Sequence, residues 1–251
     1  GGAPMDEGII RFFDQHGVKV LEAYGLAETG STTFNTLTER KAGTVGKPIG
    51  AIKIKIDPAT KEVLIKGDTV MQGYWNKPDE TKAVLRDGWF HTGDMGHIDD
   101  EGFLTITGRI KNLIMTLGGS NIPREPIEEA LLRYKYFQQV HLVGEQRKYM
   151  TALVVPNMEE LKAFARGQGL DEQQDLLGYP QIRELLWEGV AGVNRNLDQF
   201  EQIHKIGVLR SAFTVESGQL GVLGKQSSKN IEDAHRRVID ELYQAARDVQ
   251  V

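Results

Sequence analysis

The 251-residue chain has 40% hydrophobic residues, 26% charged residues and a formal net charge of -5. This length and balance allow one large globular domain or two smaller ones with real cores, and they do not favour a disordered chain. The net negative charge, with no basic run, argues against nucleic acid as the main partner, and the absence of cysteine excludes disulfides, thiolate metal sites and a cysteine nucleophile.

The first 108 residues mostly carry strand signals, in particular alternating apolar and polar residues bounded by turn-forming residues. The predicted elements are a helix at 6–16, a short apolar strand leading into a glycine- and threonine-rich loop at 18–34, a hairpin at 52–67 that turns at 57–60, a helix at 77–85, and a hairpin at 95–108 that turns at 99–102.

After Ile110 the pattern changes to helices mixed with strands. The predicted elements are a helix at 123–137, two strands within 138–156, helices at 159–169 and 182–200, a strand at 205–209, and a closing helix at 230–249 with Asn230 as its N-cap. We therefore place the boundary between two structural units at residues 109–111.

Several polar residues and glycines near this boundary suit a phosphate-bearing ligand. They include Asp94 in a Thr-Gly-Asp turn, Arg109, Lys111 and the glycine pair Gly118-Gly119. Each also has a structural explanation: a turn-forming aspartate, a surface ion pair, a solvated lysine and a tight loop before a helix.

Four motifs together resemble the AMP-forming acyl-CoA synthetases, or adenylate-forming ligases. They are YGLAETGST, GYWNKPDETKAV, DGWFHTGD and GRIKNLIMTLGGSNIPREPIE, which occur in the family's order between residues 24 and 128, and the resemblance as a whole covers nearly the whole chain. The glycine pair, the RKYMTALVVPN hairpin and FTVESGQL are similar to the long-chain fatty-acid branch.

The resemblance implies a mixed α/β and α+β fold, the carboxyl-terminal part of the adenylate-forming ligase fold. Residues 1–108 would be the end of the large AMP-binding domain with its β-barrel-like subdomain, residues 109–111 a hinge, and residues 112–251 a small mobile lid domain. The chain begins on Gly-Gly-Ala-Pro-Met, which we interpret as a cut through a larger protein.

The reaction implied is the activation of a fatty acid with ATP to an acyl-adenylate, followed by transfer of the acyl group to coenzyme A. Magnesium would accompany ATP/AMP, and the partners would be fatty acid, ATP, coenzyme A and the missing amino-terminal part of the same protein. No apolar stretch approaches the roughly 20 residues of a membrane helix. We therefore expect a cytoplasmic protein, for which peripheral membrane contact is permitted.

The resemblance also assigns roles in the large domain. Tyr24 and Gly25 match positions at the adenine, and Glu28 matches the magnesium ligand. Thr29 matches the hydroxyl that touches the α-phosphate, and Asp94 and Arg109 match the groups that hold the ribose. Gly2, Ala3 and Pro4 resemble the glycine-rich loop on the adenine side.

In the lid, Lys111 matches the hinge, and Gly118 and Gly119 match the wall of the pantetheine tunnel. Lys225, with Lys229 as the alternative, matches the lysine that bridges substrate carboxylate and α-phosphate. Its context, GVLGKQSSK, departs from the family's Thr-Pro-Thr pattern. It is no Walker phosphate loop either, because Gln219 and Gln226 occupy positions that need a glycine and a Ser or Thr.

The family's Ser/Thr/Gly-rich phosphate loop and most of its acyl pocket precede the first motif, so this chain alone is expected to be inactive. Two alternatives remain open. One is an acyl-AMP ligase with another acceptor, and the other is a non-catalytic fragment that binds a nucleotide or a partner. The length of the acyl chain and the oligomeric state are not encoded in any pattern that we recognise.

Overall fold

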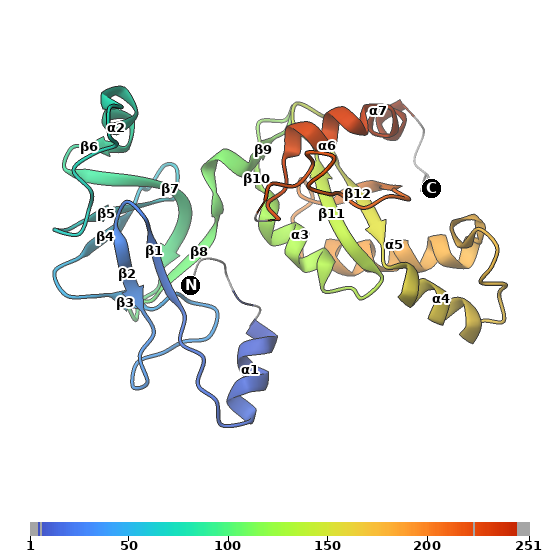
Figure 1. Cartoon of the computed structure of the whole chain (residues 1–251), viewed down its shortest axis with the longest axis horizontal. Helices are drawn as coiled ribbons and strands as arrows, with labels where there is room; N and C mark the ends of the chain where they lie inside the picture. The colour runs from blue at the N-terminus through green and yellow to red at the C-terminus, as the bar shows by residue number, and fades with distance from the viewer. Residues whose placement is uncertain (1–4, 6, 223, 245–251) are drawn as a thin grey trace. The chain divides into compact units, whose positions relative to one another are not determined.

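The computed structural model describes residues 5, 7–222 and 224–244, which belong to two compact units, Gly1–Asn112 and Leu113–Val251 (Figure 1). The first unit is built mainly from strands, and the second combines a small sheet with helices on both faces. This mixture confirms the expected mixed α/β and α+β fold class.

The first unit is organised around the long strand β7, which pairs antiparallel with β5, β6 and β8. The sheet order is β4-β5-β7-β6, and a separate antiparallel sheet has the order β1-β2-β3. The elements are α1 (Glu7–Gln15), β1 (Ala23–Leu26), β2 (Gly30–Phe34), β3 (Lys47–Pro48), β4 (Lys53–Ile56), β5 (Glu62–Lys66), α2 (Pro78–Val84), β6 (Leu85–Arg86), β7 (Trp89–Ile98), β8 (Leu104–Arg109) and the 3-10 turn η1 (Ile110–Asn112).

Buried side chains of β5 and β8 form the core of this unit. Val63, Ile65 and Leu104 are fully buried, and partly buried residues from β1 and β4 pack against them. Lys53 and Lys55 alternate with Ile54 and Ile56 and stay exposed. The predicted hairpin with a lysine-lined solvent face is therefore confirmed.

The prediction for residues 18–34 is wrong in two ways. Residues 18–22 form no strand, and the segment predicted as a loop is an antiparallel hairpin of β1 and β2. The β-branched Thr32 and Thr33 are fully buried, and their hydroxyls donate to the carbonyls of Tyr24 (3.1 Å) and Val45 (2.6 Å). These bonds satisfy polar side chains inside a strand, which the composition had suggested would stay in a loop.

The predicted Thr-Gly-Asp turn also belongs to a strand. Residues 92–94 continue β7, with Gly93 at φ +71° and an irregular register opposite β5. A glycine in this conformation produces a local bulge without ending the strand.

The second unit is a three-layer arrangement around the sheet β11-β12-β13 (Figure 1). One sheet face packs on α3, α4 and α5, and the opposite face packs on α6 and α7. The elements are β9 (Leu113–Met115), β10 (Asn121–Pro123), α3 (Arg124–Leu132), β11 (Phe137–Val143), β12 (Met150–Pro156), α4 (Met158–Gly167), the 3-10 turn η2 (Leu176–Gly178), α5 (Pro180–Asn194), β13 (Ile203–Val208), α6 (Ser228–Ala234) and α7 (Arg236–Gln244).

The closing helix differs from its prediction. It is broken at His235 into α6 and α7, and Ser227 rather than Asn230 occupies the N-cap position. The Asn230 amide instead donates to the carbonyl of Gly218 at 2.7 Å, so a tertiary contact replaces the expected cap. The predicted helix at 123–137 also ends earlier, at Leu132, because Phe137 opens strand β11.

Candidate functional site

The carboxylate of Asp94 is a buried polar group of the first unit. Only 3% of this residue is exposed. Its Oδ2 accepts a hydrogen bond from the Tyr24 hydroxyl at 2.6 Å, and its Oδ1 lies 2.8 Å from Nε of Arg109. Asp94 and Arg109 are cross-strand partners on β7 and β8, so the sheet register itself brings the two charges together.

The strand bulge that carries Asp94 is held by two side chains. The Thr92 hydroxyl accepts from the Asp94 amide at 3.0 Å, and it also donates to the carbonyl of Val63 at 2.8 Å. The buried carboxylate of Glu62 accepts from the Gly93 amide at 2.9 Å and lies 2.8 Å from Nδ1 of His91. These bonds fix the backbone on both sides of Gly93.

Glu62 was missed by the sequence reasoning. An acidic residue that opens a buried apolar run, EVLI, is the signal that could have revealed it, because such a carboxylate needs a partner when it is buried.

Tyr24 serves this site as a neutral hydrogen-bond donor. Burial, followed by the adjacent charge of Asp94, raises the pKa of the Tyr24 hydroxyl well above its ordinary value. Gly25 follows on the same strand, where a Cβ would lie 2.2 Å from the carbonyl oxygen of Gly30. The close approach of β1 and β2 therefore requires glycine at this position.

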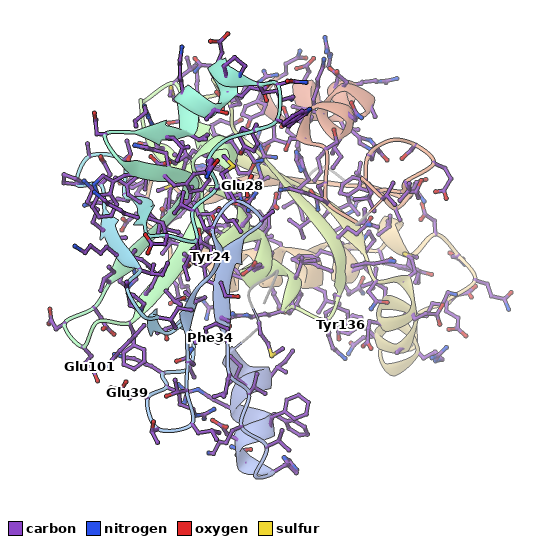
Figure 2. All side chains as sticks on the ribbon, turned by 60° about the vertical axis from the view of Figure 1, so that its left-hand side comes forward. Tyr24, Glu28, Phe34, Glu39, Glu101 and Tyr136 are labelled. Carbon is purple, nitrogen blue, oxygen red and sulfur yellow. The ribbon has the colours of Figure 1, made fainter. Side chains whose placement is uncertain are left out.

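Glu28 lies in the turn between β1 and β2 (Figure 2). Its Oε1 accepts from the Tyr74 hydroxyl at 2.9 Å, and its backbone carbonyl accepts from the Met71 amide at 2.7 Å. Tyr74 is a second residue that the sequence reasoning missed. The neighbouring Thr29 is fully buried, and its hydroxyl accepts from the Leu26 amide and donates to the Gly30 carbonyl.

The carboxylate of Glu28 is a suitable ligand for magnesium that is bound together with a nucleotide. Mg²⁺ in such sites takes one or two carboxylates, with phosphate oxygens and waters completing its coordination. Among the described residues no group of three or more His, Cys, Asp or Glu side chains could hold a metal by itself. The single carboxylate is therefore compatible with the ion only when phosphates supply further oxygens.

The remaining predicted residues lie in other places. Lys111 is exposed within η1, directly before the division between the two units. Gly118 and Gly119 are exposed in the loop between β9 and β10, and a Cβ at Gly118 would have 3.8 Å to its nearest neighbour. Gly2, Ala3 and Pro4 lie outside the described residues.

Both candidate lysines belong to the second unit. Lys225 is exposed near the end of a short loop, and Lys229 is exposed in the first turn of α6. The first unit thus brings together Tyr24, Asp94 and Arg109, whereas the glycine pair and Lys225 belong to the second.

Two family models match the chain. Residues 1–75 match the model described as AMP-binding enzyme, and residues 111–247 match the model described as AMP-binding enzyme C-terminal domain.

Named relatives cover nearly all of this chain. The long-chain-fatty-acid–CoA ligase FadD15 of Mycobacterium tuberculosis is 31% identical over 247 residues, which are 97% of this chain and 41% of the relative. The long-chain-fatty-acid–CoA ligase ACSBG1 of Homo sapiens is 30% identical over 274 residues. The match covers 97% of this chain and 37% of the relative. The chain therefore spans about two fifths of the length of these relatives.

Solved structures agree on the fold. The A domain of carboxylic acid reductase from Segniliparus rugosus, in complex with AMP and a co-purified carboxylic acid, gives a TM-score of 0.74 at 23% identity, covering 97% of this chain and 38% of that one. The O-succinylbenzoate coenzyme A synthetase MenE from Bacillus subtilis, in complex with AMP, gives a TM-score of 0.66 at 22% identity. The match covers 100% of this chain and 46% of that one.

Proposed function

Because the chain belongs to the family of AMP-binding enzymes, we propose that it supplies the carboxyl-terminal portion of an ATP-dependent long-chain fatty-acid–CoA ligase. A carboxylate oxygen of the acid attacks the α-phosphorus of ATP, and pyrophosphate leaves. The thiol of coenzyme A then attacks the carbonyl carbon of the acyl-adenylate, the thiol proton is released, and AMP leaves. The names of the relatives at about 30% identity support the fatty-acid class.

The observation that carries the proposal is the arrangement around Asp94. A buried carboxylate that accepts from Tyr24 and faces Arg109 offers two acceptor oxygens beside a guanidinium. The two hydroxyls of a ribose are donors that such a carboxylate can accept, and the guanidinium can donate to ribose and phosphate oxygens. The aromatic ring of Tyr24 supplies an apolar surface for adenine at the same place.

The turn at Glu28 would complete the phosphate side of the nucleotide. When magnesium is bound there, it neutralises charge on the phosphates and polarises them towards attack. Glu28 would hold the ion, while the bond from Tyr74 limits the orientations open to its carboxylate. Thr29 would place its hydroxyl near the α-phosphate after exchanging one of its two local hydrogen bonds.

The second unit would act as a lid whose pivot is Lys111. In one pose Lys225 would reach the carboxylate and the α-phosphate, where a cation stabilises developing negative charge. In the other pose Gly118 and Gly119 would line the path of the thiol. Hinge positions lie at element ends and absorb backbone rotation, which fits an exposed residue in the single 3-10 turn between β8 and the unit boundary.

The test is an assay of both half-reactions in the full-length protein that contains this chain. We expect acid-dependent exchange of pyrophosphate into ATP, and formation of acyl-CoA from long-chain acids. An absence of both activities with every fatty acid tested contradicts the ligase assignment. Pyrophosphate exchange without transfer to coenzyme A would identify an acyl-AMP ligase with another acceptor.

The same assay on residues 1–251 alone should show no turnover, because the chain spans about two fifths of its relatives. Turnover by these residues alone would contradict our view that the site is completed by a further part of the protein. No helix among the described residues is long and apolar enough to cross a bilayer.

A further inference from the structure

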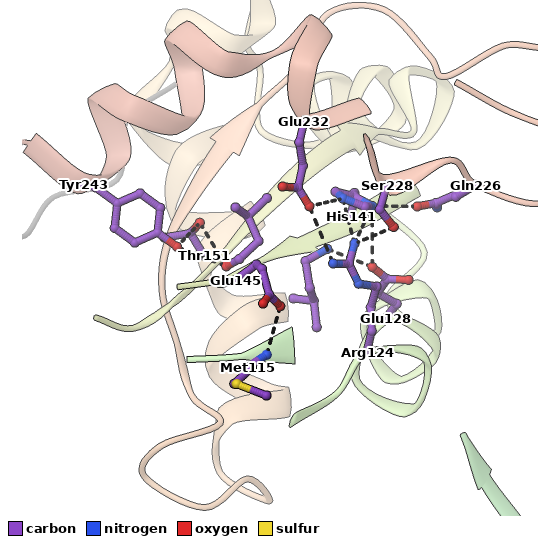
Figure 3. Close-up of polar contacts among 12 residues, drawn as sticks. Met115, Arg124, Glu128, His141, Glu145, Thr151, Gln226, Ser228, Glu232 and Tyr243 are labelled. Carbon is purple, nitrogen blue, oxygen red and sulfur yellow. Dashed lines mark hydrogen bonds and ion pairs between the residues drawn. The ribbon is translucent and has the colours of Figure 1, made fainter. Parts of the chain in front are cut away.

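A buried polar network lies in the second unit beneath the loop that carries Lys225 (Figure 3). Its centre is His141 on β11, which is 0% exposed on the sheet face towards α6 and α7. Side chains from α3, α6 and the loop before α6 converge on this imidazole. Arg124, Gln226 and Glu232 contact the ring, Ser228 accepts from Arg124, and Glu128 lies at the edge of the network.

The Gln226 side-chain amide indicates the direction of the hydrogen bonds in this network. The Gln226 amide donates from Nε2 to the carbonyl of Val140 at 2.9 Å, so its Oε1 is the acceptor 2.9 Å from Nδ1 of His141. Nδ1 therefore carries the hydrogen. In a neutral ring Nε2 then accepts from Nη1 of Arg124, which lies 2.8 Å from Nε2 and 3.2 Å from Nδ1 and also donates to the Ser228 hydroxyl at 3.1 Å. The contact of Nε2 with Oε1 of Glu232 is longer, at 3.3 Å. The guanidinium, the imidazole and the amide form one chain that ends on the backbone of β11.

The loop before α6 is a small hairpin whose end carries Lys225. Leu220 and Gln226 form an isolated β-bridge, the Gly221 amide donates to the Lys225 carbonyl at 2.7 Å, and the Ser227 amide donates to the Gln219 carbonyl at 2.8 Å. The backbone of Lys225 is thus fixed by the residues on either side of it, although its side chain is exposed.

Each strand of this hairpin is anchored by a glutamine. The Gln219 side chain accepts from the Ser217 hydroxyl at 2.8 Å and lies 2.9 Å from Nε2 of His235. Gln226 is held by His141 and Val140 as described. These two residues are the ones that rule out a Walker loop, and the structure gives both of them an anchoring contact.

We propose that Gln226 is a positioning residue for Lys225 in adenylate formation, acting through the chain from Arg124 and His141. This inference rests on the proposed ligase function and deepens it. Gln226 directly follows Lys225, so the contacts of its side chain with His141 and Val140 anchor the backbone segment that carries the lysine. If this anchoring is lost and Lys225 is misplaced, its contact with the transition state is weakened more than substrate binding.

The electrostatics of the network favour a neutral imidazole. Burial lowers the pKa of His141, an effect that the contact with Glu232 only partly offsets. The charged and titratable groups near the ring are Arg124 and Glu128 on α3, Glu232 on α6 and His235 between α6 and α7. A neutral ring with its hydrogen on Nδ1 donates to Gln226 and accepts from Arg124, which makes the shorter of the two contacts with Nε2, 2.8 Å against 3.3 Å for Glu232.

The test uses Gln226→Met, which keeps the length of the side chain and removes the amide. In the full-length protein we expect acid-dependent pyrophosphate exchange to fall at least tenfold in kcat, with a KM for ATP within threefold of wild type. The release of AMP from preformed acyl-adenylate by coenzyme A should change less than threefold. A general loss of structure would lower both half-reactions together.

The matched control is Gln202→Met in the same unit. Like Gln226, Gln202 donates its amide to the backbone, here to the carbonyls of Asn194 and Leu197, but it anchors the end of α5 instead of the hairpin. We expect this variant to leave both half-reactions within twofold of wild type. Gln226→Glu, which can still accept from His141 but cannot donate to Val140, should fall between wild type and Gln226→Met and provides a second variant if the methionine protein does not fold.

A double-mutant cycle with Lys225→Ala separates this inference from the ligase function. If Gln226 acts through Lys225, then Gln226→Met should lower pyrophosphate exchange by less than twofold in the Lys225→Ala background. Additive losses, equal losses in both half-reactions, or a Lys225→Ala variant with full exchange would overturn the positioning role. A wild-type protein with neither half-reaction would instead overturn the proposed function.

Discussion

At the scale of single residues, the carboxylates of Asp94 and Glu128 lie in contrasting electrostatic surroundings. Asp94 has a cation and a hydroxyl donor within hydrogen-bond distance, which is the environment of an anion ready to accept further bonds. Glu128 is largely buried, with 13% of its side chain exposed, and it accepts from the Leu142 amide at 2.8 Å. Its burial outweighs that bond and the neighbouring Arg124, and raises the pKa of the Glu128 carboxyl to about 7.

Asp94→Asn should weaken nucleotide binding with little change in shape. The amide keeps one acceptor but loses the charge that faces Arg109, and hydrogen bonds to charged groups contribute about 1.5–3 kcal/mol. We therefore expect the Kd for AMP, measured by calorimetry on the full-length protein, to rise about 10- to 100-fold. Asp100→Asn, at an exposed residue in the turn between β7 and β8, is the control. An unchanged Kd in Asp94→Asn would contradict the ribose-binding role.

Glu128→Gln should gain stability relative to wild type as the pH rises. The folded chain holds the Glu128 proton more tightly than the unfolded chain, so the free energy of unfolding of wild type falls between pH 4.5 and about 7. Glutamine keeps the acceptor for the Leu142 amide and does not ionise, which removes this loss of up to about 3 kcal/mol.

The measurement for Glu128 is denaturant unfolding of both proteins from pH 5 to pH 8. The lowered pKa of His141 gives the opposite slope below pH 6.5, but it does so in both proteins and largely cancels in the difference. If the difference in the free energy of unfolding between the two proteins stays constant from pH 5 to pH 8, then ionisation of Glu128 does not destabilise the folded chain and the prediction is wrong.

At the scale of elements, the sequence predicted the strands and helices whose apolar period is regular, and it failed where polar side chains override that period. The hairpin of β4 and β5 and the helices α4 and α5 were expected from periodicity alone. The hairpin of β1 and β2 was not, because its buried threonines read as loop residues until their hydroxyl partners are known.

The site residues divide in the same way. Asp94, Arg109 and Tyr24 were singled out from motifs, and the structure brings them into contact. Glu62, Tyr74 and His141 were not, because each has a partner far away in the sequence, 31, 46 and 85 residues for Gly93, Glu28 and Gln226 respectively. Such partners are set by sheet register and layer packing, which a single sequence does not display.

The loop between β9 and β10 permits a test of the proposed thiol path. A Cβ at Gly118 would meet only ordinary contact distances, so Gly118→Ala should change stability by less than about 0.5 kcal/mol. We expect thioester formation to fall at least tenfold, and pyrophosphate exchange to stay within twofold, if a methyl group obstructs that path.

The control for the loop is Gly192→Ala on α5, where a Cβ has open space. It should leave both half-reactions unchanged and stabilise the helix by about 0.5–1 kcal/mol. If Gly118→Ala and the larger Gly118→Val both retain full thioester formation, the pantetheine role of this loop is wrong.

At the scale of the whole molecule, the two units divide the proposed chemistry between them. The groups assigned to the nucleotide belong to Gly1–Asn112, and those assigned to the bridging lysine and the thiol path belong to Leu113–Val251. In our proposal, the second unit presents Lys225 in one pose and the glycine pair in the other. The pivot at Lys111 is therefore the part of the proposal on which the complete reaction depends.

Lys111→Pro should spare adenylate formation more than thioester formation. Proline fixes φ near -65° and restricts the residue before it, here Ile110, so it removes rotational freedom from η1. Single-turnover assays of each half-reaction measure the effect, with Lys111→Ala as the control that removes the side chain and keeps the freedom. Equal losses in both half-reactions would contradict a pivot at this residue.

The position of Arg109 at the end of β8, immediately before η1, has a thermodynamic consequence. If a nucleotide restrains Arg109 and thereby favours one lid pose, linkage requires that the same pose bind the nucleotide more tightly by an equal factor. Loss of pyrophosphate and exchange of ATP for the adenylate would then alter the free-energy difference between the poses. The ligand that is being transformed would in this way set the order of the two steps, with no separate regulator.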